Sequence, residues 1–177
     1  MKPPSDFILT KTDPIHQTAN SKVFLGTYEG KEAITKVFPL EFPSESIQRS
    51  YQKDHHVSSL LYEKYPDNFS EPLKFFNNQN KLFVIKTFEG ISFSKLIEEQ
   101  KKMDLKTFLR LAISVCENLQ LIHQQNVIHC DIKPQNILYN KKNEKIIIID
   151  SESSFLVSLK NPKVPYAERG KSKSNQI

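Results

Sequence analysis

Apolar residues in the first half of this chain come in short runs separated by polar residues. The runs span residues 7–9, 23–28, 33–38, 73–76 and 82–85, and their length is typical of β-strands. A longer polar segment between the third and fourth runs follows Pro43, and Ser44 is a residue type that caps helices. We therefore expect a helix over residues 44–64, whose apolar positions fall on one approximate face: Ile47, Tyr51, Val57, Leu60 and Leu61.

Beyond Gly90 the apolar residues recur every three to four positions, which predicts helices. A short helix is expected over residues 93–101, and a longer one from Leu105 to about residues 123–126. A hairpin follows, because strand-like residues 136–139 and 145–149 flank a polar turn at 140–144. Residues 136 and 150 then come from opposite ends of one hairpin, where antiparallel pairing brings them together.

Composition narrows the class of protein. A chain of 177 residues allows one domain of ordinary size, and 38% hydrophobic with 25% charged residues is typical of a globular chain. No apolar run approaches a membrane span, and the N-terminus lacks the apolar core of a secretory signal. Cys116 and Cys130 are the two cysteines, so we expect no disulfide framework and a reducing cytoplasm.

The net charge of +5 is partly terminal, because residues 161–177 contain Arg169, Lys171 and Lys173. We expect this basic tail to be solvated and flexible, with docking to an acidic partner as the alternative. The basic residues are not interleaved with aromatic ones, which argues against nucleic-acid binding.

The richest chemistry lies in residues 129–136, His-Cys-Asp-Ile-Lys-Pro-Gln-Asn, and in Asp150 after the apolar run 146–149. Asp131 and Lys133 are two positions apart, so an extended backbone projects both to one side. Pro134 disfavours helix at Lys133, which predicts a rigid loop. A carboxylate at Asp131 can accept a hydroxyl proton, Lys133 can lie along a phosphoryl group, and Asn136 and Asp150 offer oxygen ligands to magnesium.

This segment resembles the catalytic loop and the metal-binding aspartate of eukaryotic-type serine/threonine protein kinases. The resemblance covers residues 7–154 and implies an α+β, two-lobed fold with an antiparallel, β-rich small lobe and a truncated helical large lobe. The corresponding division of the single domain is a small lobe over 7–85, a hinge over 86–90 and a large lobe over 91–160. A short C-terminal part makes the chain similar to the compact kinases of some bacteria and viruses, which act inside host cells, unless the chain is a fragment.

The same resemblance implies ATP and Mg²⁺ as cofactors and a role for each matching residue. Asp131 would be the catalytic base with Lys133 on the transferred phosphoryl, Asn136 and Asp150 would hold the metal, and Lys36 would contact the α- and β-phosphates. Ile85 would be the gatekeeper before the hinge residues Lys86 and Thr87, and the adenine would lie between Val23, Ile34 and Leu138. Asp54 is the expected helix acid opposite Lys36, with Glu45 and Glu63 as alternatives.

Three departures from the family pattern stand out. The loop that should cover the phosphates, residues 16–23, has no glycine, so phosphate binding would need side chains such as Thr18, Asn20 and Ser21. Cys130 stands where many kinases have arginine, which argues against control by a phosphorylated activation loop. Asp150 is followed by Ser151 and Glu152 in place of phenylalanine and glycine.

The resemblance thus implies phosphoryl transfer from ATP to serine or threonine hydroxyls of a protein substrate, with a host protein as one potential partner. Two alternatives remain open. A kinase-like binding module that sequesters a partner protein would explain the glycine-free loop, and a small-molecule kinase would share the phosphate-binding residues.

Overall fold

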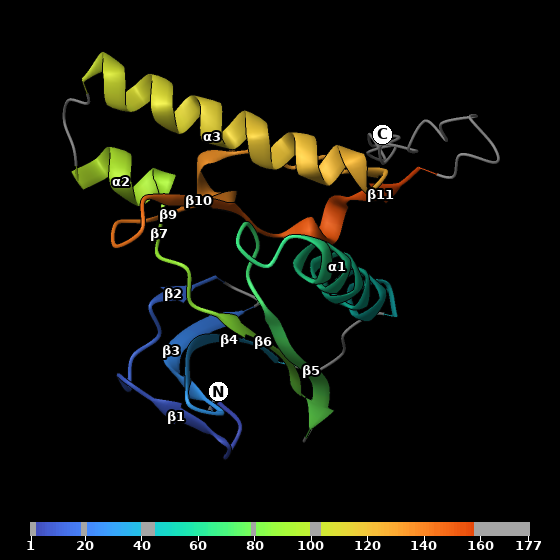
Figure 1. Cartoon of the computed structure of the whole chain (residues 1–177). Helices are drawn as coiled ribbons and strands as arrows, with labels where there is room; N and C mark the ends of the chain where they lie inside the picture. Colours follow the sequence, from blue (N-terminus) through green and yellow to red (C-terminus); the bar gives the residue numbers. More distant parts are fainter. Residues whose placement is uncertain (1–2, 19–20, 40–44, 79–80, 100–103, 158–177) are drawn as a thin grey trace, which may run out of the picture.

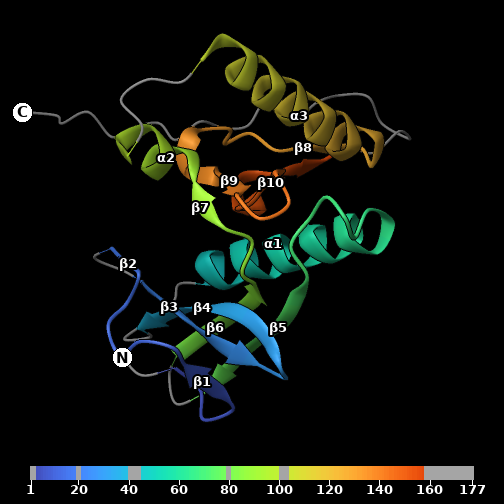
Figure 2. The same ribbon diagram turned by 60° about the vertical axis from the view of Figure 1, so that its left-hand side comes forward.

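The computed structural model describes residues 3–18, 21–39, 45–78, 81–99 and 104–157. One antiparallel sheet fills the lower part of Figure 1, and a second group of short strands and two helices lies above it. Helix α1 lies between the two (Figures 1 and 2). None of the helices in these ranges is long and apolar enough to cross a membrane.

The first sheet has the strand order β1-β3-β4-β6-β5, with β2 paired to β3. Its strands are β1 (Phe7–Leu9), β2 (His16–Gln17), β3 (Lys22–Tyr28), β4 (Lys31–Pro39), β5 (Pro72–Asn78) and β6 (Lys81–Thr87). The sheet therefore matches the predicted small lobe. The central strands β4 and β6 position side chains that are important below, because their register places Lys36 opposite Val84 and Ile34 opposite Lys86.

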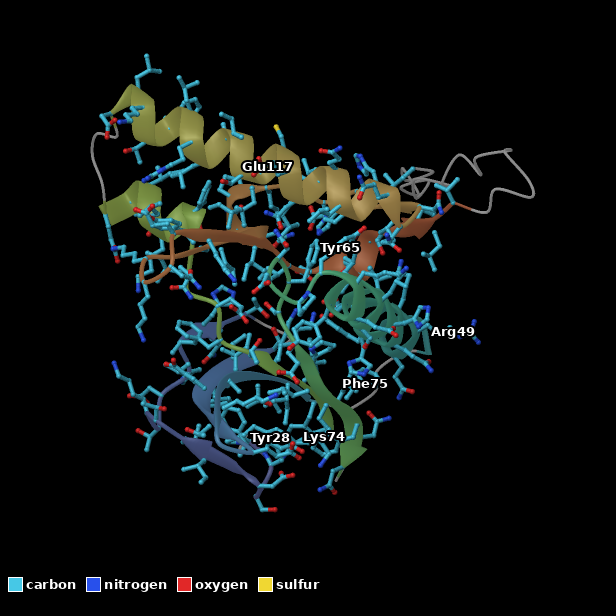
Figure 3. All side chains as sticks on the ribbon, viewed as in Figure 1. Tyr28, Arg49, Tyr65, Lys74, Phe75 and Glu117 are labelled. Carbon is cyan, nitrogen blue, oxygen red and sulfur yellow. The ribbon has the colours of Figure 1, made fainter. Side chains whose placement is uncertain are left out.

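The two faces of this sheet have different neighbours. On one face Phe38, Leu82 and Val84 pack against Tyr51 of α1 (Glu45–Lys64). Phe75 of β5, labelled in Figure 3, extends this contact by stacking on His55 of the same helix at 5.7 Å. The other face forms a separate core from seven buried residues: Phe7, Phe24, Tyr28, Ala33, Val37, Phe83 and Ile85. Alternation along each strand thus decides which side chains meet α1.

The second part of the molecule is built around the predicted hairpin. Strands β9 (Ile137–Asn140) and β10 (Lys145–Ile148) pair antiparallel, and β7 (Ile91–Ser92) adds a third strand. Helices α2 (Phe93–Glu99) and α3 (Leu105–Gln124) cover it. Asp104 caps the start of α3, where its carboxylate accepts from the Thr107 N–H at 2.9 Å. Strand β8 (Val127–Ile128) pairs with β11 (Phe155–Leu156). Two single-turn 3₁₀ helices, η1 (Pro134–Asn136) and η2 (Ser151–Ser153), flank the hairpin.

One apolar cluster joins the two parts. Val57 and Leu61 of α1 meet Ile122 of α3, Val127 of β8 and Ile148 of β10, all nearly fully buried. Helix α1 therefore belongs to both cores, so its position links the first sheet to the hairpin.

The predicted strands and helices are confirmed, with ends that move by a few residues. The sequence did not indicate the two-residue strands β2, β7, β8 and β11, which are too short for a periodic signal. The expected cap Ser44, the end of the helix predicted over 93–101 and the basic tail at 161–177 lie outside the described residues.

Candidate active site

The loop from His129 to Asn136 connects β8 to the hairpin. Cys130 has φ 65°, in the left-handed region, which reverses the chain direction just before Asp131. Lys133 is extended (φ −154°, ψ 160°), as expected before a proline, and Pro134 occupies the first turn of η1. The chain is thus not helical at Lys133, as predicted, and residues 134–136 form the single turn η1 before the strand begins at Ile137.

Asp131 is held by two neighbours from its own loop. Lys133 Nζ lies 2.6 Å from Asp131 Oδ2, and the Asn136 amide donates to the same oxygen at 2.9 Å and to the Asp131 carbonyl at 3.0 Å. The hydrogen bond from Lys133 is the main reason that the pKa of Asp131 lies below its ordinary value, and Asn136 adds to it. About a third of the Asp131 side chain remains exposed (35%), so a charged carboxylate faces solvent with a fixed direction.

His129 ties this loop to the end of β10. Its Nε2 lies 3.1 Å from the Ile149 carbonyl, and its Nδ1 accepts from the Asp131 N–H at 3.3 Å. Burial holds the pKa of His129 below its ordinary value, which favours the neutral ring that this bonding pattern requires. The imidazole therefore positions the backbone of Asp131 relative to Asp150.

The end of the hairpin places Asn136 next to Ile149, the residue before Asp150. The Ile149 N–H donates to the Asn136 carbonyl at 2.9 Å, which continues the register of Ile148 opposite Ile137. Because the Asn136 amide nitrogen is used by Asp131, its Oδ1 is the atom left to bind a cation. This oxygen and the Asp150 carboxylate are hard donors, which suit Mg²⁺. In the described part of the chain no group of three or more His, Cys, Asp or Glu could hold a metal, so phosphate and water oxygens would have to complete the shell.

Lys36 of β4 reaches this region from the first sheet. Its ammonium lies 3.2 Å from Glu152 Oε1 and over the rings of Tyr51 (4.9 Å) and Phe38 (5.1 Å). Burial raises the pKa of Glu152 to about 7; Lys36 acts in the opposite direction, and the nearby Asp150 carboxylate adds to the rise. The acid beside Lys36 is therefore on η2 and not on α1.

The expectation that Asp54 pairs with Lys36 is wrong. Its carboxylate is 3% exposed and pairs with Lys86 Nζ at 2.6 Å, not with Lys36. Its other oxygen accepts from Ser151, from the N–H at 2.8 Å and from the hydroxyl at 3.1 Å. Burial opposes ionisation, but Lys86 and the Ser151 donors together hold the pKa of Asp54 below its ordinary value.

The position of Ile85 also differs from the expectation. It is completely buried on the sheet face that turns away from α1, whereas Lys86 lies opposite Ile34 and its side chain extends to Asp54. Neighbouring strand residues point to opposite faces, so the residue that can face the site at the end of β6 is Lys86. Ile85 therefore does not face the site, contrary to the expectation that it would be the gatekeeper.

Some hydrogen-bond donors of the predicted hinge are already bonded within the protein. The Thr87 N–H donates to the Glu71 carbonyl and the Phe88 N–H to the Glu32 carbonyl, each at 3.0 Å. The Thr87 hydroxyl donates to Glu89. These two backbone donors are therefore not free for an adenine base in this conformation.

The remaining predicted contact residues lie where the strands place them. Val23 is directly opposite Lys36 on β3, and Ile34 lies two residues before Lys36 on the same face. Leu138 is on β9, opposite Ile147. All three side chains are half-buried and outside the core clusters, so part of each apolar surface remains accessible.

The loop between β2 and β3 uses its hydroxyls to close a turn. The Ser21 N–H donates to Thr18 Oγ1 at 3.0 Å, the Thr18 N–H donates to the Ser21 carbonyl at 2.9 Å, and the two hydroxyls lie 2.9 Å apart. Asn20 lies outside the described residues. Thr18 and Ser21 thus stabilise the loop in place of glycine.

Glu152, Tyr51 and the role of Lys86 were missed in the sequence. The family pattern indicates only the loss of a glycine at Glu152, whereas a charged residue two positions after Asp150 is the signal of a new ion pair. Tyr51 was assigned only to an apolar helix face. These residues contact Lys36 and Asp54 from distant parts of the chain, and no local sequence pattern indicates such contacts.

Comparison with known proteins identifies the family to which the chain is similar. The family model of the protein kinase domain matches residues 11–167. Kinase suppressor of Ras A of Caenorhabditis elegans is 26% identical over 145 residues, covering 80% of this chain and 18% of that protein. A protein of Acanthamoeba polyphaga mimivirus named as a serine/threonine-protein kinase is 28% identical over 167 residues, covering 86% of this chain and 55% of that protein.

A bacterial relative, serine/threonine-protein kinase D of Synechocystis, is 27% identical over 111 residues, covering 60% of this chain and 20% of that protein. The chain spans between 12% and 55% of the length of the curated relatives it matches.

Proposed function

Because this chain belongs to the protein kinase domain family, we propose that it transfers a phosphoryl group from ATP to serine or threonine hydroxyls of a protein substrate. Residues 7–85 would act as the small lobe, 86–90 as the hinge and 91–160 as the large lobe. ATP supplies the phosphoryl group, and Mg²⁺ neutralises phosphate charge when bound. The work of the protein is to position both reactants and to stabilise charge.

Each role in this proposed reaction is assigned to a residue of the candidate active site. Asp131 would orient the substrate hydroxyl and accept its proton, while Lys133 would balance charge on the transferred group. Asn136 and Asp150 would hold Mg²⁺, and Lys36 would contact the α- and β-phosphates. Val23, Ile34 and Leu138 would offer apolar surface to the adenine.

The single observation that carries this proposal is the geometry at Asp131. Its carboxylate is ionised, partly exposed, and fixed by Lys133 at 2.6 Å and Asn136 at 2.9 Å. A carboxylate that only capped a turn would not need a lysine and an asparagine on one oxygen. A general base has to be charged, oriented and accessible, and Asp131 meets these requirements.

The test is phosphate transfer from labelled ATP to a generic protein substrate by the unmodified chain and by Asp131→Ala. We expect the variant to lose at least a hundredfold in rate, as is typical when a general base is removed. The matched control is Asp67→Ala, an exposed carboxylate that pairs with Lys145 at 3.1 Å. Equal rates for Asp131→Ala and the unmodified chain would contradict the proposal.

A binding module that does not transfer phosphate is the second candidate. The occupied N–H groups of Thr87 and Phe88 favour it. The two functions differ in nucleotide binding: Mg-ATP at a hundred times its Kd stabilises a binding protein by about 2.7 kcal/mol. For a chain of this length, that corresponds to a rise in Tm of about 5–10 °C. No rise in Tm at millimolar Mg-ATP would favour the binding module.

A further inference from the structure

We propose that Glu152 is the positioning carboxylate for Lys36, in place of an acid on helix α1. The proposal rests on the proposed function, because it assigns the residue that directs Lys36 toward the phosphates of ATP. Glu152 does not react. It holds the Lys36 ammonium between the end of β4 and the metal-binding Asp150.

The geometry around Lys36 supports this assignment from two sides. Lys36 Nζ and Glu152 Oε1 are 3.2 Å apart, and both side chains are about three-quarters buried (28% and 23% exposed). The ring of Tyr51 lies under the ammonium at 4.9 Å, and the ring of Phe38 lies at 5.1 Å. The Lys36 ammonium is therefore held by the Glu152 carboxylate and by two aromatic rings, which limits its rotamers.

Asp54, the acid that the sequence favoured on α1, already has other partners. One of its oxygens accepts from Lys86, and the other accepts twice from Ser151. Lys86 also donates to Ser58 on the same helix at 3.0 Å. Moving Asp54 to Lys36 would leave the Lys86 ammonium, whose side chain is 12% exposed, without a carboxylate, which is costly.

The contact with Glu152 leaves Lys36 able to bind phosphate. An ammonium has three N–H donors, and a single carboxylate oxygen uses one of them. The alternative is that Glu152 competes with the phosphates and keeps Lys36 away from them. The two possibilities predict opposite changes in nucleotide affinity when the charge of Glu152 is removed.

The experiment measures the Kd of Mg-ATP by titration calorimetry and the kinetic constants of transfer. We expect Glu152→Gln, which keeps the shape of the side chain, to raise the Kd roughly tenfold, the typical effect of one charge-assisted hydrogen bond. Glu152→Asp should give an intermediate Kd. Glu144→Gln is the matched control, because Glu144 forms an exposed pair with Arg110 at 3.0 Å on the hairpin turn.

A double variant separates positioning from general stability. If Glu152 acts through Lys36, then Glu152→Gln should add less than twofold to the Kd of Lys36→Met. A merely structural residue would instead add its full effect.

A lower Kd in Glu152→Gln would show that Glu152 blocks the nucleotide, and an unchanged Kd would show that it has no role; either result overturns the inference. Both results leave the proposed function standing if the unmodified chain still transfers phosphate. Absence of Mg-ATP binding by the unmodified chain would overturn the inference and the proposed function together.

Discussion

Replacing Lys86 by methionine is the sharpest test of how α1 is held. Methionine keeps the length and apolar stem of the side chain but removes the cation that lies 2.6 Å from Asp54. Breaking a buried ion pair from one side typically costs about 3–5 kcal/mol, because the other charge stays buried. Asp54 would keep both bonds from Ser151, so we expect a loss of about 2–3 kcal/mol in the free energy of unfolding.

The assay is urea unfolding followed by far-UV circular dichroism, because the chain has no tryptophan for fluorescence. For a chain of this length, the expected loss corresponds to a fall in Tm of roughly 4–12 °C. The matched control is Lys31→Met, because Lys31 pairs with Glu71 at 2.6 Å but is half exposed. Exposed pairs contribute little, so we expect this control to stay close to the unmodified chain.

The pH dependence of the loss gives a second check. The pKa of Asp54 is lowered in the folded protein, so its ionisation contributes stability above the unfolded pKa, and this contribution is lost as pH falls through the folded pKa. Without Lys86, burial would raise the folded pKa of Asp54. The deficit of Lys86→Met should therefore be largest near neutral pH and shrink in acid. A deficit that equals the Lys31→Met control at pH 7, or that grows in acid, would refute the reasoning.

Two further predictions concern the backbone and the shared core. Gly90→Ala should lower the unfolding free energy by more than about 2 kcal/mol, because residue 90 has φ 122° and a Cβ would meet the Tyr139 carbonyl. Gly30→Ala, at φ 79° with open space around it, should cost only about 1 kcal/mol, and equal losses in urea unfolding would contradict the steric argument. Ile122→Ala should cost about 2–5 kcal/mol, because Ile122 is 1% exposed in the cluster that joins the two parts of the molecule. Ile97→Ala, at a position 59% exposed, is its control, and similar melting temperatures for the two variants would show that the shared cluster contributes little.

Much of the fold could be predicted from the sequence because its signals are local. The strands of the first sheet and helix α3 follow from the spacing of apolar residues, and the hairpin follows from two strand-like runs around a polar turn. The grouping of Asp131, Lys133 and Asn136 was also predictable, since six consecutive residues contain all three. The predicted hairpin also explains why Ile149, the residue before Asp150, pairs with Asn136.

The ion pairs could not be predicted, because they join residues far apart in the chain. Lys36 and Glu152 are 116 residues apart, and Lys86 and Asp54 are 32 apart. Two lysines and two acids can pair in two ways, and no local feature of the sequence indicates which pairing forms. Ile85 shows a different limit: a shift of one residue along β6 moves a side chain to the opposite face, and only the register with β4 fixes which residue faces α1.

The unexpected partners of Lys36 and Asp54 have one physical cause. Because Lys86 faces α1, its ammonium enters a nearly buried region and needs a carboxylate, which Asp54 provides. Asp54 is then no longer available to Lys36, so a second acid has to come from another element. Glu152 provides it from η2, which packs against α1. Lys86 and Glu152 thus belong to one arrangement of charges, in which Lys86 pairs with Asp54 and Lys36 pairs with Glu152.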